Sequence, residues 1–300
     1  MGLAGGLLST SINAVSYPAL RPAGKAAFFM FCRPFQRVAV REAERDVHDR
    51  ATVESLRVNG KDVRTYRWGA GDKPVLLVHG WQSRGSRFAA HVPEIESLGF
   101  GAVTFDAPGH GDSGGNTTTI LEYCDIIRQL SDRFGGFSAI VGHSFGLTCA
   151  AFALRCGAYA DRLISISGVC DFSHLVVQFS DQVGLNQRVQ TDLRRRIEEQ
   201  LFASQPDIWR RFSADYEPDS LTMPILVIHD EKDNMVPLAQ ADKIVAAYGP
   251  RARMIVTKGL GHRRILSDRA VLDAAVAFLA DAAPSKKPAS ASAMRARRLP

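Results

Sequence analysis

Gly142-His143-Ser144-Phe145-Gly146 follows the apolar run at residues 137–141 and precedes a segment with helical character. A G-x-S-x-G sequence between a strand and a helix is typical of a sharp turn that exposes the serine hydroxyl. The two flanking glycines have no Cβ to collide with neighbouring backbone, so Ser144 can adopt strained dihedral angles. The stretch predicts Ser144 as a nucleophile, but five residues are only moderately specific, and the surrounding chain must decide.

Short apolar runs and amphipathic segments alternate along most of the chain. A hairpin is expected at residues 53–58 and 63–68, joined at Asn59-Gly60. Further strands are expected at 74–78, 102–105, 138–141, 163–169, 225–228 and 254–257, and helices at 87–98, 119–134, 145–156, 238–248 and 269–282. This alternation predicts an α/β fold with an eight-stranded, mostly parallel, doubly wound sheet.

Residues 171–222 interrupt the alternation, because they carry helical periodicity but no signal of a parallel strand. We expect a helical cap inserted over the carboxyl edge of the sheet, where ligands bind in open α/β folds. Surface helices without a role in recognition are the alternative. The expected organisation is a lead segment at 1–50, a core at 51–170 and 223–283, the cap, and a disordered basic tail at 284–300.

The net charge of +6 is concentrated at the ends of the chain. Residues 1–41 and residues 284–300 each hold five basic residues and no acidic residue, which leaves residues 42–283 at −4. The body of the protein therefore offers no broad cationic face, and we expect no nucleic-acid partner.

The five cysteines are odd in number and have no C-x-x-C or metal-like spacing, which indicates free thiols and a cytoplasmic location. No transmembrane helix or secretion signal is expected, and an organelle transit peptide is disfavoured because the first arginine is Arg21. The apolar residues 26–32 could rest on a membrane surface or line the mouth of a pocket, but a helix packed on the core is the favoured interpretation.

Serine needs a histidine base, and the histidine needs a carboxylate to orient it. Asp233 follows the seventh expected strand and His262 follows the eighth, which gives the chain order Ser, Asp, His. The carboxyl ends of parallel strands meet at one edge of a sheet, so these side chains can converge with Ser144. Asp230 also follows the seventh strand and could act as a surface turn residue or as a second carboxylate for the histidine.

Four motifs in order make residues 53–282 resemble the α/β-hydrolase superfamily, in particular serine esterases and lysophospholipases with a helical cap. The motifs are His79-Gly80-Trp81, the segment 106–113, Gly142–Gly146, and the Asp233 and His262 segments. In that family two backbone N–H groups form the oxyanion hole, which here implies Trp81 and Phe145. The resemblance also implies the last position of the Asp230–Asp233 segment as the triad acid. The other seven histidines are taken as structural.

The resemblance implies a serine hydrolase that cleaves a carboxylic ester or thioester of a small acyl substrate, with no metal or organic cofactor. Acyl transfer, carbon–carbon hydrolysis and cofactor-free perhydrolysis use the same triad, and a non-catalytic ligand-binding protein is a further alternative. The arginines at 194–196 and 263–264 could attract an anionic substrate, although a solvated surface explains them more simply.

Overall fold

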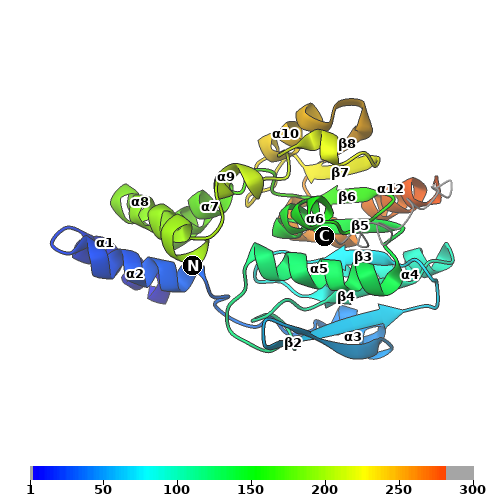
Figure 1. Ribbon diagram of the computed structural model, residues 1–300, viewed down its shortest axis with the longest axis horizontal. Coiled ribbons are helices and arrows are strands. Elements are labelled where there is room, and N and C mark those ends of the chain that lie inside the picture. Colours follow the sequence, from blue (N-terminus) through cyan, green and yellow to red (C-terminus); the bar gives the residue numbers. More distant parts are fainter. Residues whose placement is uncertain (1–2, 282–300) are drawn as a thin grey trace, which may run out of the picture.

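An eight-stranded sheet forms the centre of the protein, whose computed structural model describes residues 3–281 (Figure 1). The strand order is β1-β2-β4-β3-β5-β6-β7-β8. β2 is antiparallel to both of its neighbours, and the other pairs are parallel. The strands are β1 Thr52–Val58, β2 Lys61–Trp68, β3 Val75–Val78, β4 Ala102–Phe105, β5 Ala139–His143, β6 Leu163–Ile166, β7 Ile225–Asp230 and β8 Ala252–Thr257. The predicted fold class is confirmed.

Two apolar layers cover the sheet, because successive strand residues point to opposite faces. In β3, Leu76 and Val78 face one layer while Val75 and Leu77 face the other, and all four are fully buried. The first layer is formed by α5 Ile120–Phe134, α6 Phe145–Arg155 and α10 Ala239–Tyr248. The second is formed by α4 His91–Ser97 and α12 Arg269–Ala280, with α3 Glu42–Asp49 at its margin.

Two of the predicted elements are shorter in the structure. The helix expected at 87–98 is divided into a 3₁₀ turn, η1 Gly85–Phe88, and α4. The Asp106 carboxylate holds the start of η1 by accepting the backbone N–H of Gly85 at 2.8 Å. The strand expected at 163–169 ends at Ile166, because Ser167 has a φ of 47° that no strand residue adopts. The remaining short elements are η4 Gly249–Arg251, α11 Gly261–Arg264 and η5 Ile265–Ser267.

Between β6 and β7 the chain forms a helical insert, residues 171–222. Its elements are α7 His174–Val183, α8 Gln187–Arg196, η2 Ile197–Leu201, α9 Ile208–Arg211 and η3 Pro218–Ser220. Phe172, Phe202 and Phe212 meet edge to face, with ring centroids 5.0–6.1 Å apart, and are buried in the same apolar cluster as α5 and α6. The insert is therefore continuous with one face of the core.

Two N-terminal helices, α1 Leu3–Ser16 and α2 Leu20–Phe31, pack on the insert and stand apart from the sheet in Figure 1. We call them the N-terminal hairpin. Ala23 and Ala27 of α2 form a small buried cluster with Ile12 and with Val189 of α8. Phe28, Met30 and Phe31 of α2 pack against the main apolar cluster, as the favoured interpretation of a lead helix packed on the core expects. The small residues of α2 add a close helix contact with α8 that the sequence did not indicate.

Polar groups fix the hairpin to the insert at two places. The Asn13 side chain donates to the carbonyl of Gly184 at 2.7 Å and accepts from the N–H of Asn186 at 2.9 Å. At the second place Gly24 lies directly against the buried carboxylate of Asp192, which Arg196 holds at 2.6 Å. These contacts fix the N-terminal hairpin to the helical insert. The sequence had placed these residues only in a lead segment.

No helix within residues 3–281 is long and apolar enough to cross a bilayer. The basic tail expected to be disordered, residues 284–300, lies outside the described residues.

Gly24→Ala should loosen the hairpin even though alanine is the better helix former. A Cβ at this position would lie 1.7 Å from Asp192 Oδ2, and two arginines hold that carboxylate in place. We expect a loss of about 1–3 kcal/mol in the free energy of unfolding, as for other overpacked sites. Hydrogen exchange should accelerate in residues 10–31. The control is Lys25→Ala on the exposed side of α2, and equal exchange rates in the two variants would contradict this packing.

Candidate active site

Ser144 occupies the turn between β5 and α6 with φ 56° and ψ −126°, a conformation that is strained for any residue with a side chain. The turn is held by the Ser144 N–H, which donates to Ile166 of the neighbouring strand at 3.1 Å. A Cβ on Gly146 would lie 2.1 Å from the carbonyl oxygen of Val78, and one on Gly142 would lie 2.6 Å from Leu147 Cα. Glycine is therefore required at both positions, and the serine between them remains partly accessible.

His262 lies in α11, after β8, and its Nδ1 is 2.8 Å from Asp233 Oδ2. Because a carboxylate accepts, this nitrogen carries the proton and leaves Nε2 as the basic nitrogen. The other Asp233 oxygen accepts the N–H groups of Met235 and Val236 at 2.8 and 2.9 Å. Burial disfavours the charged carboxylate, but these three hydrogen bonds and the attraction to His262 outweigh it and lower the pKa of Asp233 to about 2.

Asp230 has different partners and does not contact the histidine ring within the described hydrogen bonds. Its Oδ2 accepts from the Thr257 hydroxyl at 2.8 Å and from the N–H of Leu260 at 2.9 Å, and its Oδ1 accepts from the N–H of Lys232. Asp230 therefore connects the end of β7 to the loop that carries His262. The structure brings Asp233, and not Asp230, to the histidine.

Two backbone N–H groups flank Ser144. Phe145 is the first residue of α6, so its N–H has no acceptor within the helix. Gly80, the residue before Trp81, lies so close to the serine that a Cβ there would be 2.9 Å from Ser144 Cβ and 3.3 Å from its Oγ. The Trp81 and Phe145 rings meet edge to face, with centroids 6.4 Å apart. Phe145 thus follows the serine directly, and Trp81 follows a glycine that lies against it.

His79 and His110 join the Trp81 loop to the loop that follows β4, a role that sequence reasoning described only as structural. His79 donates from Nδ1 to the Gly80 carbonyl at 2.7 Å and accepts from the Ala107 N–H at 3.0 Å. His110 accepts from the Gln82 N–H at 3.1 Å. Burial is the main cause that lowers the pKa of His79 to about 4 and that of His110 to about 3. Both rings are therefore neutral at pH 7, as a ring that donates once and accepts once must be.

His143, the variable residue of the Gly142–Gly146 motif, contacts the backbone of His262. Its Nε2 donates to the main-chain carbonyl of His262 at 2.9 Å, and the two rings lie 4.8 Å apart. Burial, followed by the neighbouring His262, lowers the pKa of His143 to about 3. The residue directly before the serine therefore positions the backbone of His262. The sequence did not indicate this role, because the second position of the G-x-S-x-G motif is variable.

An apolar pocket begins at Trp81 and Phe145 and extends between the sheet edge, the helical insert and α2. It encloses about 670 Å³, part of which is open to solvent, and every lining residue is uncharged. Six aromatic side chains form much of its wall: Phe31, Trp81, Phe145, Phe172, Phe179 and Phe202. Phe31 belongs to the N-terminal hairpin, so a segment outside the insert completes the pocket.

Four of the five arginines that could have attracted an anionic substrate interact with other groups of the protein, and the fifth, Arg263, is exposed. Arg195 pairs with Asp192 and Glu199, each at 2.6 Å, and the guanidinium of Arg194 lies 3.8 Å from the centre of the Trp209 ring. Arg264 donates to the carbonyls of Gly259 and Leu260. Within residues 3–281 no group of His, Cys, Asp and Glu side chains is arranged to hold a metal ion.

The sequence profile of the alpha/beta hydrolase family matches residues 75–275. The chain belongs to the alpha/beta hydrolase family. The matched region contains Ser144, Asp233 and His262, and it begins after the N-terminal hairpin and β2. The comparison with curated protein sequences gives no significant match.

Solved structures with the same fold include an esterase, Pf2001, from Pyrococcus furiosus, with 17% identity, a TM-score of 0.62 and coverage of 81% of this chain and 97% of that one. Alpha/beta hydrolase domain-containing protein 10 from mouse has 20% identity, a TM-score of 0.59 and coverage of 77% and 98%. A monoacylglycerol lipase from Paleococcus ferrophilus has 18% identity, a TM-score of 0.56 and coverage of 73% and 98%. At these identities the similarity shows a shared fold.

Asp233→Asn should make the protein less stable at neutral pH and change how stability depends on acid. The Asp233 pKa is depressed in the folded state, so its stabilisation is present above the unfolded value of about 3.9 and is lost as the pH falls toward about 2. We expect the wild type to exceed the variant by about 1–2 kcal/mol at pH 7, allowing for solvent screening.

Urea unfolding at a series of pH values measures this difference. The gap between wild type and Asp233→Asn should narrow from about pH 5 to about pH 2. Asp242→Asn, which changes an exposed carboxylate on α10, is the control and should follow the wild type. A gap that stays constant over this range would contradict the assigned role of the Asp233 charge.

Proposed function

We propose that this member of the alpha/beta hydrolase family is a serine hydrolase that cleaves a carboxylic ester or thioester through an acyl-enzyme intermediate. The observation that carries the proposal is the 2.8 Å contact between His262 Nδ1 and the buried Asp233 carboxylate, at the same sheet edge as the strained Ser144. A strained backbone at this serine lowers the stability of the fold, and such strain is concentrated at functional sites. A purely structural serine would not need it.

In the proposed reaction, His262 Nε2 removes the proton of Ser144 Oγ while the oxygen attacks the substrate carbonyl carbon. The N–H groups of Trp81 and Phe145 hold the resulting oxyanion. The imidazolium then donates the same proton to the leaving alcohol or thiol, and an acyl-serine remains. Water loses a proton to His262, attacks the acyl carbon, and the acid leaves as the proton returns to Ser144.

Asp233 orients His262 for each of these proton transfers. Its carboxylate is fixed by two backbone N–H groups in addition to the ring, so the histidine is held with Nε2 unprotonated before substrate binds. The negative charge then stabilises the imidazolium that forms in each step. The low pKa of Asp233 keeps this charge in place at neutral pH.

The pocket favours an apolar, uncharged acyl group. Its wall begins at the two proposed oxyanion donors and holds aromatic and aliphatic side chains, with glutamines and threonines as its polar groups. Charged parts of a substrate would lose hydration without gaining an ion pair there. Neutral esters or thioesters with an apolar acyl chain therefore fit best, and any charged leaving group would lie outside the pocket. The esterase, lipase and thioesterase names among the structural relatives agree with this class.

A fluorophosphonate probe should label the wild type at Ser144, because the probe reacts with an activated serine hydroxyl. Ser144→Ala should abolish labelling and lower kcat for ester hydrolysis by about 10⁴-fold or more. Ser97→Ala, which changes an exposed hydroxyl on α4, should be labelled like the wild type. No labelling of folded wild type would refute the proposal and favour a ligand-binding protein.

Leu175→Trp should shorten the preferred acyl chain, because Leu175 lines the pocket and a larger ring would fill part of it. Across p-nitrophenyl esters from acetate to palmitate, we expect KM to rise at least about tenfold for long chains and little for acetate. Val177→Trp is the matched control, since Val177 lies on the same helix but is 41% exposed. An identical chain-length profile for Leu175→Trp and wild type would exclude this pocket as the acyl site.

A further inference from the structure

The exposed aromatic side chains of the described residues gather on the N-terminal hairpin and the segment directly after it. They are Tyr17, Phe29 and Phe35, which are 70%, 56% and 52% exposed. The exposed large apolar residues elsewhere within residues 10–281 are valines. Leaving three aromatic rings in water on one short segment is unfavourable, so an uncovered surface of this kind marks an interaction site.

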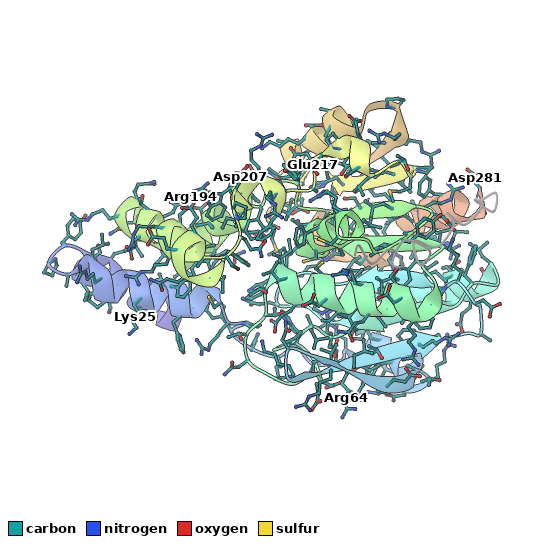
Figure 2. The ribbon with its side chains drawn as sticks, viewed as in Figure 1. Lys25, Arg64, Arg194, Asp207, Glu217 and Asp281 are labelled. Carbon is teal, nitrogen blue, oxygen red and sulfur yellow. The ribbon has the colours of Figure 1, made fainter. Side chains whose placement is uncertain are left out.

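Basic residues lie between these rings on α2 and directly after it. Arg21, Lys25 and Phe29 are spaced four residues apart and lie on one side of the helix, opposite the buried Ala23, Gly24 and Ala27. Arg33 follows, with its guanidinium 3.6 Å from the centre of the Phe29 ring. We call Tyr17, Arg21, Lys25, Phe29, Arg33 and Phe35 the aromatic-basic strip. Figure 2 shows Lys25 on the outer side of the hairpin, on the side away from Arg194.

Acidic side chains are scarce around the strip. Residues 1–41 contain none, and the one acid of α8, Asp192, is buried between Arg195 and Arg196. Arg188 of α8 adds a cation next to the strip, with its guanidinium 5.6 Å from the centre of the Tyr17 ring. On α7 the exposed acid is Asp181. The strip therefore carries a positive charge that the neighbouring helices do not neutralise.

The strip also adjoins the apolar pocket. Phe31 and Cys32 line the pocket and lie in sequence between Phe29 and Arg33. Phe35 stacks on Phe179 with ring centroids 6.3 Å apart, and Phe179 is itself part of the pocket wall. A surface that covers the strip would thus lie beside the α2 side of the pocket.

We propose that the aromatic-basic strip docks the protein on the surface of an anionic lipid bilayer. Aromatic rings favour the boundary between headgroups and acyl chains, and lysine and arginine are attracted to anionic headgroups. A protein partner would need acidic residues matched to the cations, whereas a bilayer accepts any arrangement of them. Docking would place the pocket next to the membrane, from which apolar substrates could enter. The docking itself does not depend on the proposed hydrolase activity.

Cosedimentation with vesicles tests the proposal. Wild type should bind vesicles of equal parts phosphatidylcholine and phosphatidylglycerol, bind pure phosphatidylcholine vesicles weakly, and dissociate as salt is raised. Replacing Arg21, Lys25 and Arg33 by Gln should weaken binding to anionic vesicles by about a hundredfold, at about fivefold for each cation. Replacing Tyr17, Phe29 and Phe35 by Ser should weaken it by about tenfold or more, because binding scales with buried apolar area.

Two control variants match these changes away from the strip. One control changes three exposed arginines to Gln and so removes the same charge: Arg45 on α3, Arg57 on β1 and Arg64 on β2. Val53 and Val256, 53% and 41% exposed on the sheet, can be changed to Ser. Both controls, and Ser144→Ala, should bind like the wild type. Melting temperatures show whether each variant is folded.

Two results would overturn the proposal. The first is a wild type that does not bind anionic vesicles; if that wild type forms dimers that the strip variants lose, a second copy of the chain covers the strip. The second is strip variants that bind as tightly as the two controls. Vesicle binding without hydrolase activity would leave the docking intact and count only against the proposed function.

Discussion

The close approach of α6 to strands β3 and β5 at Ser144 is the constraint on which the rest of the site depends. It brings the start of a helix so near the sheet that Gly142 and Gly146 cannot carry a Cβ, and it forces Ser144 into a strained conformation. The Ser144 N–H donates to β6 and its carbonyl accepts from Val169, so three parts of the fold meet at this residue. The strain is stored because the surrounding backbone leaves no alternative.

The carboxyl ends of β7 and β8 carry the residues that hold His262, and two aspartates have separate roles there. Asp230 fixes the His262 loop through Thr257 and Leu260, while Asp233 fixes the ring. Each buried carboxylate is compensated by several donors, which is the condition under which a charge can remain in the interior. Three neutral histidines also hold the loops around the site, because each donates its single ring N–H to a backbone carbonyl. They are His79, His110 and His143.

Much of this was predictable from local patterns. Eight strands were expected near their observed positions, because buried parallel strands read as short continuous apolar runs. Asp233 and His262 were expected at one edge because parallel strands end on the same side of a sheet. From the residues alone the choice between Asp230 and Asp233 was open, because both follow the same strand, and only the resemblance to the family favoured Asp233. The packing of α2 on α8 was missed because its contact face consists of Ala23, Gly24 and Ala27, which carry no periodic apolar signal.

By itself, the sequence determined the α/β architecture and the order in which the chemically important residues occur along it. Periodicity and turn chemistry are local properties, so they can be read without knowing what packs against what. Only the tertiary structure decided that Asp233 contacts His262, that His143 holds the histidine loop, and that the N-terminal hairpin completes the pocket through Phe31. The residues in these contacts come from different loops, strands and helices, 29 positions apart for Asp233 and His262 and 119 for His143 and His262, and their geometry depends on how whole layers pack.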